Sequence, residues 1–387
     1  MSKIAHNLTD RQTDRRNYGV DLLRIIAMIG VVTNHLLTQG GALYVSNNDV
    51  QNAIIYLFVI VSYFAVNCYI LISGYVNYSE NEIKKGRYSK IVSLWLQVVF
   101  WGIILNILPG YFITGTISAK SIIMSIFPVT FQQYWFFTAY FGLFFVMPTL
   151  NHLCSTYSKS KLLKLIIVCT MLFSVYATFV SPLGDHFLLS RGFSFLWFCM
   201  LYVIGASMKK YDWMKYSKNS YLISLLALNI IITLFCSIFL GKLTHSLFGV
   251  SLGESILLSY NSPTILVGAV CIVALFIRLD FKHLRGIIRY WSSVTFGVYI
   301  IHMHPIIKNY LLMNNFEWLG YLNVLIMPFV IVGIAILITI VCLVLDKIRE
   351  YIFCFLKVKK IGLLLENCIG RLFAKIMNKI LRIDNEC

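Results

Sequence analysis

Stretches of mostly apolar residues, each about as long as a membrane-spanning helix, recur along nearly the whole chain of 387 residues. Hydrophobic residues make up 59% of the chain and charged residues 13%, and the mean hydropathy is +0.78, which excludes a soluble globular protein of ordinary composition. A helix needs about 20 residues to cross the hydrocarbon core of a bilayer. The sequence therefore predicts an all-α polytopic membrane protein with about ten transmembrane helices, at residues 20–37, 53–75, 91–108, 134–151, 162–180, 193–208, 221–240, 256–277, 294–310 and 321–345.

The basic residues gather in the segments that would face one side of the membrane. With a cytoplasmic N-terminus, most of the 33 Lys and Arg residues fall in inward-facing segments, as the positive-inside rule requires. The net charge of +17 then follows from topology and from attraction to anionic lipid, so membrane lipids are expected as partners and nucleic acid is not. We expect a multi-pass protein of a bacterial plasma membrane with cytoplasmic N- and C-termini.

Three regions follow from the same pattern. We expect residues 1–19 to form a cytoplasmic arm, residues 20–346 a single transmembrane domain, and residues 347–387 a basic cytoplasmic tail. A run at 117–127, within the loop 109–133, is too short to cross the membrane and predicts a re-entrant or interfacial piece. In the tail, apolar residues recur at helical spacing opposite basic ones and predict an amphipathic interfacial helix: Leu365, Ile369, Leu372, Phe373, Ile376 and Ile380.

Cysteine spacing gives no sign of a metal centre. The ten cysteines are scattered singly, without a C-x-x-C pair or a paired Cys/His spacing. Neither a disulfide framework nor a bound metal is therefore expected.

The first span contains three ionisable residues, Asp21, Arg24 and His35. Arg24 and His35 are eleven residues apart, which on a helix returns to within about 20° of the same face and spans roughly 16 Å. Ionisable groups inside a membrane are costly and often functional. Two interpretations remain open. The three residues form a functional stripe on one face of the helix, or Asp21 and Arg24 only mark the edge of the helix while His35 packs in the core.

Other segments carry recognisable patterns. The ninth span reads S-x-x-F-G-x-Y-x-x-H-x-x-P from Ser293 to Pro305, and the first reads D-x-x-R from Asp21, followed by His35; residues 72–75, 84–90, 134–137 and 147–148 are corroborative. In this order and at these spacings they resemble the acyltransferase-3 family of integral membrane acyltransferases, which modify cell-surface glycans and related acceptors. The resemblance covers most of the chain. It implies a membrane domain of roughly ten helices, an acyl-coenzyme A donor, and an essential Arg and His at the spacing of Arg24 and His35.

The resemblance gives the first span a chemical role. Transfer of an acetyl group to a sugar hydroxyl requires removal of the hydroxyl proton, and a neutral imidazole, with an ordinary pKa of about 6.5, suits that task. We therefore expect His35 to be the general base, although a covalent acetyl-imidazole is also possible, and Asp21 to orient Arg24. Arg24, Arg87 and Lys90 would bind the phosphates of acetyl-coenzyme A. Arg87 and Lys90 are equally explained by positive-inside topology, and Lys90 departs from the arginine that the family more often has there.

Three further residues are weaker candidates for substrate binding. His302 would hydrogen-bond substrate or orient another group, unless it only packs between helices. Glu254 would assist proton transfer from the outer end of the eighth span, where a loop carboxylate is also unremarkable. Trp135 would stack on substrate, unless it belongs to the aromatic belt of the membrane surface.

The sequence thus predicts a membrane O-acyltransferase that moves an acetyl or other short acyl group from acyl-coenzyme A to a hydroxyl of a cell-surface saccharide or lipid-linked glycan precursor. One alternative is a transporter or export accessory for a surface polysaccharide. Another is a regulatory membrane subunit whose charges only set helix register. The spacing of Arg24 and His35 favours the enzyme, because transport does not require it.

Overall fold

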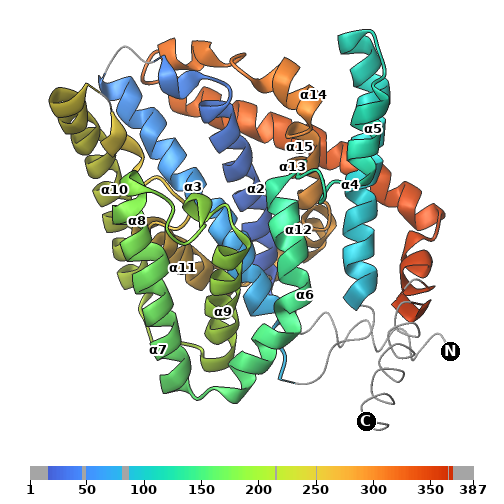
Figure 1. The fold of residues 1–387 in the computed structure, drawn as a ribbon, viewed down its shortest axis with the longest axis horizontal. Coiled ribbons are helices and arrows are strands. Elements are labelled where there is room, and N and C mark those ends of the chain that lie inside the picture. Colours follow the sequence, from blue (N-terminus) through green and yellow to red (C-terminus); the bar gives the residue numbers. More distant parts are fainter. Residues whose placement is uncertain are drawn as a thin grey trace, which may run out of the picture.

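The computed structural model describes residues 16–45, 49–80, 87–213, 216–249, 251–364 and 366–368, without the side chains of residues 87 and 252. Within these ranges the secondary structure is helical and contains no strand, which confirms the all-α class (Figure 1). The helices are α2 (Tyr18–Thr38), α3 (Asp49–Asn77), α4 (Arg87–Thr114), α5 (Ala119–Ile126), α6 (Trp135–Thr156), α7 (Lys159–Thr170), α8 (Ala177–Val180), α9 (Phe195–Tyr211), α10 (Asn219–Phe248), α11 (Pro263–Ile277), α12 (Arg285–Ser292), α13 (Thr295–His302), α14 (Pro305–Ile307) and α15 (Met327–Phe355).

Seven helical segments among the described residues are long and apolar enough to cross a membrane, or eight if a bent pair, Pro263–Ile277 with Lys282–His302, forms one broken span. The expected count of about ten is therefore approximate. One reason is α9, which has 17 residues, fewer than the roughly 20 that a crossing needs.

The eighth and ninth expected spans are interrupted. α11 begins only at Pro263, because proline suits the first turn of a helix, and the Ser262 side chain caps that turn by accepting from the Ile265 amide. In the ninth, α13 ends at His302 and α14 begins at Pro305, since a proline amide has no proton to donate. The helix axis bends by 86° between the Pro263–Ile277 and Lys282–His302 segments. His302 thus lies at a helix end.

The core of the bundle is built around α2 and α3, which lie side by side in the middle of Figure 1. α3 also packs on α9, and two glycines let their backbones touch. A Cβ at Gly205 would lie 2.1 Å from the Leu71 carbonyl oxygen, and one at Gly74 would lie 2.2 Å from that of Tyr202. Small residues at such crossings are typical of helices packed in membranes.

A buried carboxylate joins α15 to α4 and α13. Asp346 accepts hydrogen bonds from Gln97 Nε2 at 2.9 Å and from Trp101 Nε1 at 2.7 Å, and it forms a two-pronged ion pair with Arg349. α13 approaches it through Gly297, where a Cβ would lie 2.0 Å from the Asp346 Cγ. The glycine of the ninth-span motif is therefore needed for packing.

The short apolar run at 117–127 forms the helix α5, which packs against α4. The contact is close, because a Cβ at Gly102 would lie 2.7 Å from the Ser125 Cβ, and Asn106 Nδ2 donates to Ser125 Oγ at 3.0 Å. The run therefore folds back on the preceding helix.

Two expected features fall mostly outside the described residues: the arm as far as residue 15, and the amphipathic tail helix, of which Leu365 and residues 369–387 are not described. Residues 358–364 of the tail are helical. The Ser89 amide donates to the Glu366 carboxylate at 3.1 Å, which joins the tail to the start of α4.

Candidate active site

One face of α2 carries Arg24, Met28, Val31 and His35, at the steps of three and four residues that place side chains in one stripe. α2 is helical without a break from Tyr18 to Thr38, and the Asn17 side chain caps it by accepting from the Val20 amide. We call the two ends of the bundle the Arg24 end and the His35 end. The predicted alignment of Arg24 with His35 thus agrees with the helix that the structure shows.

The last three residues of the stripe line a narrow cavity, which we call the His35 cavity. Its volume is about 40 Å³, enough for a few water molecules. It is almost entirely aromatic or aliphatic apart from the imidazole, and its lining comes from α2, α3, α6, α13 and the segment before α11: Met28, Val31, His35, Val66, Tyr69, Trp135, Phe136, Tyr260, Phe296 and Tyr299.

His35 is paired with His302, which lies 267 positions later in the chain. His35 Nδ1 lies 2.9 Å from His302 Nε2, and both rings are buried. His302 Nδ1 lies 2.5 Å from the Val298 carbonyl oxygen, so it must carry a proton and donate it.

This chain of contacts fixes the tautomers when both rings are neutral, the form that burial among apolar groups favours. His302 Nε2 then has no proton and accepts from His35 Nδ1–H. His35 Nε2 is left with a free lone pair, and it has no hydrogen-bond partner among the described residues. An unprotonated imidazole nitrogen beside a cavity is the arrangement that a general base needs.

At the other end of the stripe, Asp21 is buried between two arginines. It accepts from Arg24 Nη1 at 2.6 Å and from Arg16 Nε. The Arg24 side chain remains 26% exposed, and the Tyr69 hydroxyl donates to its backbone carbonyl. The carboxylate therefore holds two guanidinium groups together at the Arg24 end, with Tyr69 linking Arg24 to the His35 cavity.

A second cavity at the Arg24 end, here called the basic cavity, has a volume of about 470 Å³. Four cations and one carboxylate line it, together with a glycine, a tyrosine and a serine: Arg16, Arg289, Lys347, Lys359, Glu350, Gly286, Tyr290 and Ser293. Arg16 joins this cavity to Asp21. Sequence reasoning assigned these cations to topology and, for Lys359, to the basic face of the tail helix, and missed that they converge.

The structure places the remaining predicted residues in different surroundings. Trp135 lines the His35 cavity. Glu254 does not, because its carboxylate accepts from the Tyr56 hydroxyl at 2.8 Å and packs against Gly241. Lys90 is exposed on the first turn of α4 and is not part of the basic cavity. Arg87 begins α4, but its side chain is outside the described part of the chain.

The described ranges hold no group of three or more His, Cys, Asp or Glu side chains that could bind a metal ion. The lining of the His35 cavity instead offers one imidazole, which is paired with His302, and phenol hydroxyls. Such groups can bind, orient and transfer a proton.

Comparison with known protein families identifies the family of the chain. No match was found among curated proteins or among solved structures. The family model of acyltransferase-3, described as an acyltransferase domain, matches residues 17–346. That range includes α2 with its stripe, the His302 helix α13 and Asp346, and it covers most of the chain, which therefore belongs to the acyltransferase-3 family of membrane acyltransferases.

Proposed function

We propose that the protein transfers an acetyl or other short acyl group from acyl-coenzyme A to a hydroxyl of a cell-surface saccharide or lipid-linked glycan precursor, with His35 as the general base. The observation that carries this proposal is the pairing of His35 with His302, which leaves His35 Nε2 free to accept a proton next to a cavity. Membership of an acyltransferase family supports the reaction class.

The proposed step balances without any further reactant. The acceptor hydroxyl oxygen attacks the thioester carbonyl carbon as its proton moves to His35 Nε2. The carbon–sulfur bond then breaks, and the proton passes from His35 to the departing coenzyme A thiolate. His302 positions His35 throughout by accepting from Nδ1–H, which stabilises the imidazolium formed during the step.

The donor would lie along the stripe of α2. Its phosphates need cations, which the basic cavity and Arg24 supply, and arginine suits two-pronged contacts with phosphate. The positive-inside pattern supports a cytoplasmic Arg24 end, where coenzyme A is found. The acyl arm would then extend along α2 for roughly 16 Å to reach His35. Because the His35 cavity is narrow, its side chains must separate to admit the arm.

The direct test is the transfer of labelled acetyl groups from acetyl-coenzyme A to a base-labile ester in the saccharide fraction, using membranes that contain the protein. His35→Ala should abolish this transfer at an unchanged protein level. His245→Ala, the same change at an exposed histidine on α10, should leave it unchanged. Full transfer by His35→Ala would exclude the base assignment. A parent protein that transfers nothing, and whose loss stops glycan export, would favour the transporter.

A further inference from the structure

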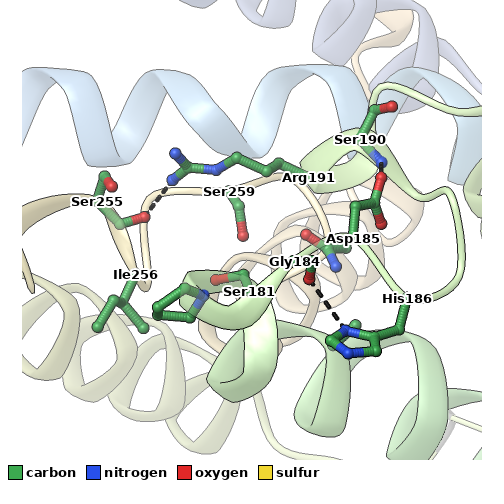
Figure 2. A pocket seen from close by; sticks show the side chains of 12 residues that line it. Ser181, Gly184, Asp185, His186, Ser190, Arg191, Ser255, Ile256 and Ser259 are labelled. Carbon is green, nitrogen blue, oxygen red and sulfur yellow. Dashed lines mark hydrogen bonds between the residues drawn. The ribbon is translucent and has the colours of Figure 1, made fainter. Parts of the chain in front are cut away.

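A polar cavity lies at the His35 end of the bundle, beside the His35 cavity but not part of it. Its volume is about 250 Å³. The loop after α8 forms one side and the segment before α11 the other (Figure 2). α11 ends next to Asn17 at the Arg24 end, so its beginning belongs to the opposite end. Its polar lining includes Asp185, His186, Arg191, Ser255, Ser259 and Asn261.

This cavity offers both donors and acceptors of hydrogen bonds. Asp185 accepts from the amides of Leu189 and Ser190, at 2.8 and 2.6 Å, and a carboxylate has further lone pairs. Arg191 Nη2 donates to the carbonyl oxygens of Ser255 and Leu258, which leaves the other N–H donors of the guanidinium available to a ligand. Among the described residues, the two charged groups are anchored to backbone rather than to each other.

Ser259 adds a hydroxyl at the centre of the cavity wall. The residue is only 4% exposed, and its hydroxyl has no hydrogen-bond partner within the part of the chain that the structure describes. Figure 2 shows this hydroxyl pointing into the space between Arg191, Ser181 and Ile256. A hydroxyl there is free to bond a ligand.

Residues 259–261 form a wall between this cavity and the His35 cavity. Ser259 and Asn261 line the polar cavity, whereas Tyr260 between them lines the His35 cavity. The wall is fixed in place, since the Tyr260 amide donates to the Arg191 carbonyl at 3.0 Å and Asn67 Nδ2 donates to the Tyr260 carbonyl at 2.7 Å. A ligand in the polar cavity would thus lie across this wall from the His35 cavity.

We propose that the polar cavity binds a neutral sugar unit of the acceptor and holds it at the Tyr260 wall, across from the His35 cavity. Each sugar hydroxyl is both donor and acceptor, so it is matched by a site that provides a carboxylate, a guanidinium and a hydroxyl. One carboxylate and one guanidinium give no excess charge to attract an acidic sugar. The volume is just below the roughly 300–1,000 Å³ of sites for drug-sized ligands, which suits one sugar ring. The proposal rests on a saccharide acceptor, as inferred above.

The test measures sugar binding without acyl transfer. Saturation-transfer NMR on the full chain in detergent would use methyl glycosides of glucose, galactose and N-acetylglucosamine, with methyl glucuronide as the charged comparison. We expect the parent protein to bind at least one neutral glycoside. Ser259→Leu should weaken that binding by about tenfold or more, because the larger side chain fills the site. Ser181→Phe, at an exposed position of the same lining, should do the same with less risk to folding.

Two controls separate this proposal from the proposed function. Ser220→Leu, at an exposed serine of the Arg24 end, should bind the glycoside as the parent does. His35→Gln should also bind it, even if acyl transfer is lost, so a failure of the base assignment leaves the sugar site standing. The proposal is overturned if the parent protein binds none of the neutral glycosides, if both obstructing variants bind normally, or if the glucuronide binds as well as the neutral sugars.

Discussion

Replacing His302 by leucine should leave His35 Nδ1–H without its acceptor while keeping the helix end packed. In the parent protein this proton bonds His302 Nε2 at 2.9 Å in a buried setting. A buried donor that loses its partner costs about 1–3 kcal/mol. The bond also selects the tautomer with a free Nε2 and stabilises the imidazolium formed in the step. If the whole cost falls on the reaction barrier, kcat drops by about 5- to 150-fold.

The assay is steady-state transfer of labelled acetyl groups, with kcat and KM determined separately for acetyl-coenzyme A. Because His302 does not line the His35 cavity, KM should change little. His302→Gln provides the matched control, since its side-chain oxygen can accept from His35 Nδ1–H and should restore most of kcat. An unchanged kcat in His302→Leu would refute the tautomer argument. A glutamine variant as slow as the leucine variant would show that His302 does more than accept a hydrogen bond.

Two further predictions concern packing and the donor. Gly297→Ala should lower the thermal unfolding midpoint in detergent, because its Cβ would lie 2.0 Å from Asp346 Cγ. Gly333→Ala, where a Cβ meets open space, should leave the midpoint unchanged. Equal midpoints for the two variants would contradict the packing argument. Arg289→Gln should raise KM for acetyl-coenzyme A with little change in kcat, and this rise in KM should become smaller with added salt. Arg285→Gln, at an exposed position outside the basic cavity, should leave KM unchanged. A KM that is the same for both arginine variants would argue against phosphate binding in the basic cavity.

The features that local spacing determines were the predictable ones. The apolar stretches predicted most of the long helices, and the eleven-residue step from Arg24 to His35 correctly indicated one face of α2. The interruptions were harder, because the apolar runs continue through Pro263 and Pro305. Both prolines were visible in the sequence and mark the positions where a helix begins again.

Contacts between distant segments could not be predicted from one sequence. The sequence offered His302 as a residue that would bind substrate or orient another group, but nothing in the first span indicates that this group is His35. The basic cavity draws its cations from the segment before α2, from α12, from α15 and from the tail, so no single stretch looks like a phosphate site. Its signal was present only as basic residues in the inward segments, which topology already explained.

The continuity of α2 fixes the separation and the relative orientation of the side chains that it carries. Because Arg24 and His35 belong to one unbroken rod, inserting a single residue between them would rotate the imidazole by about 100° away from its partner and its cavity. In a transferase that works as proposed, a rigid helix and not a flexible loop therefore sets the distance that the acyl-bearing arm of coenzyme A must span. An acyl donor with a shorter or longer arm would place its thioester carbonyl short of the imidazole or beyond it.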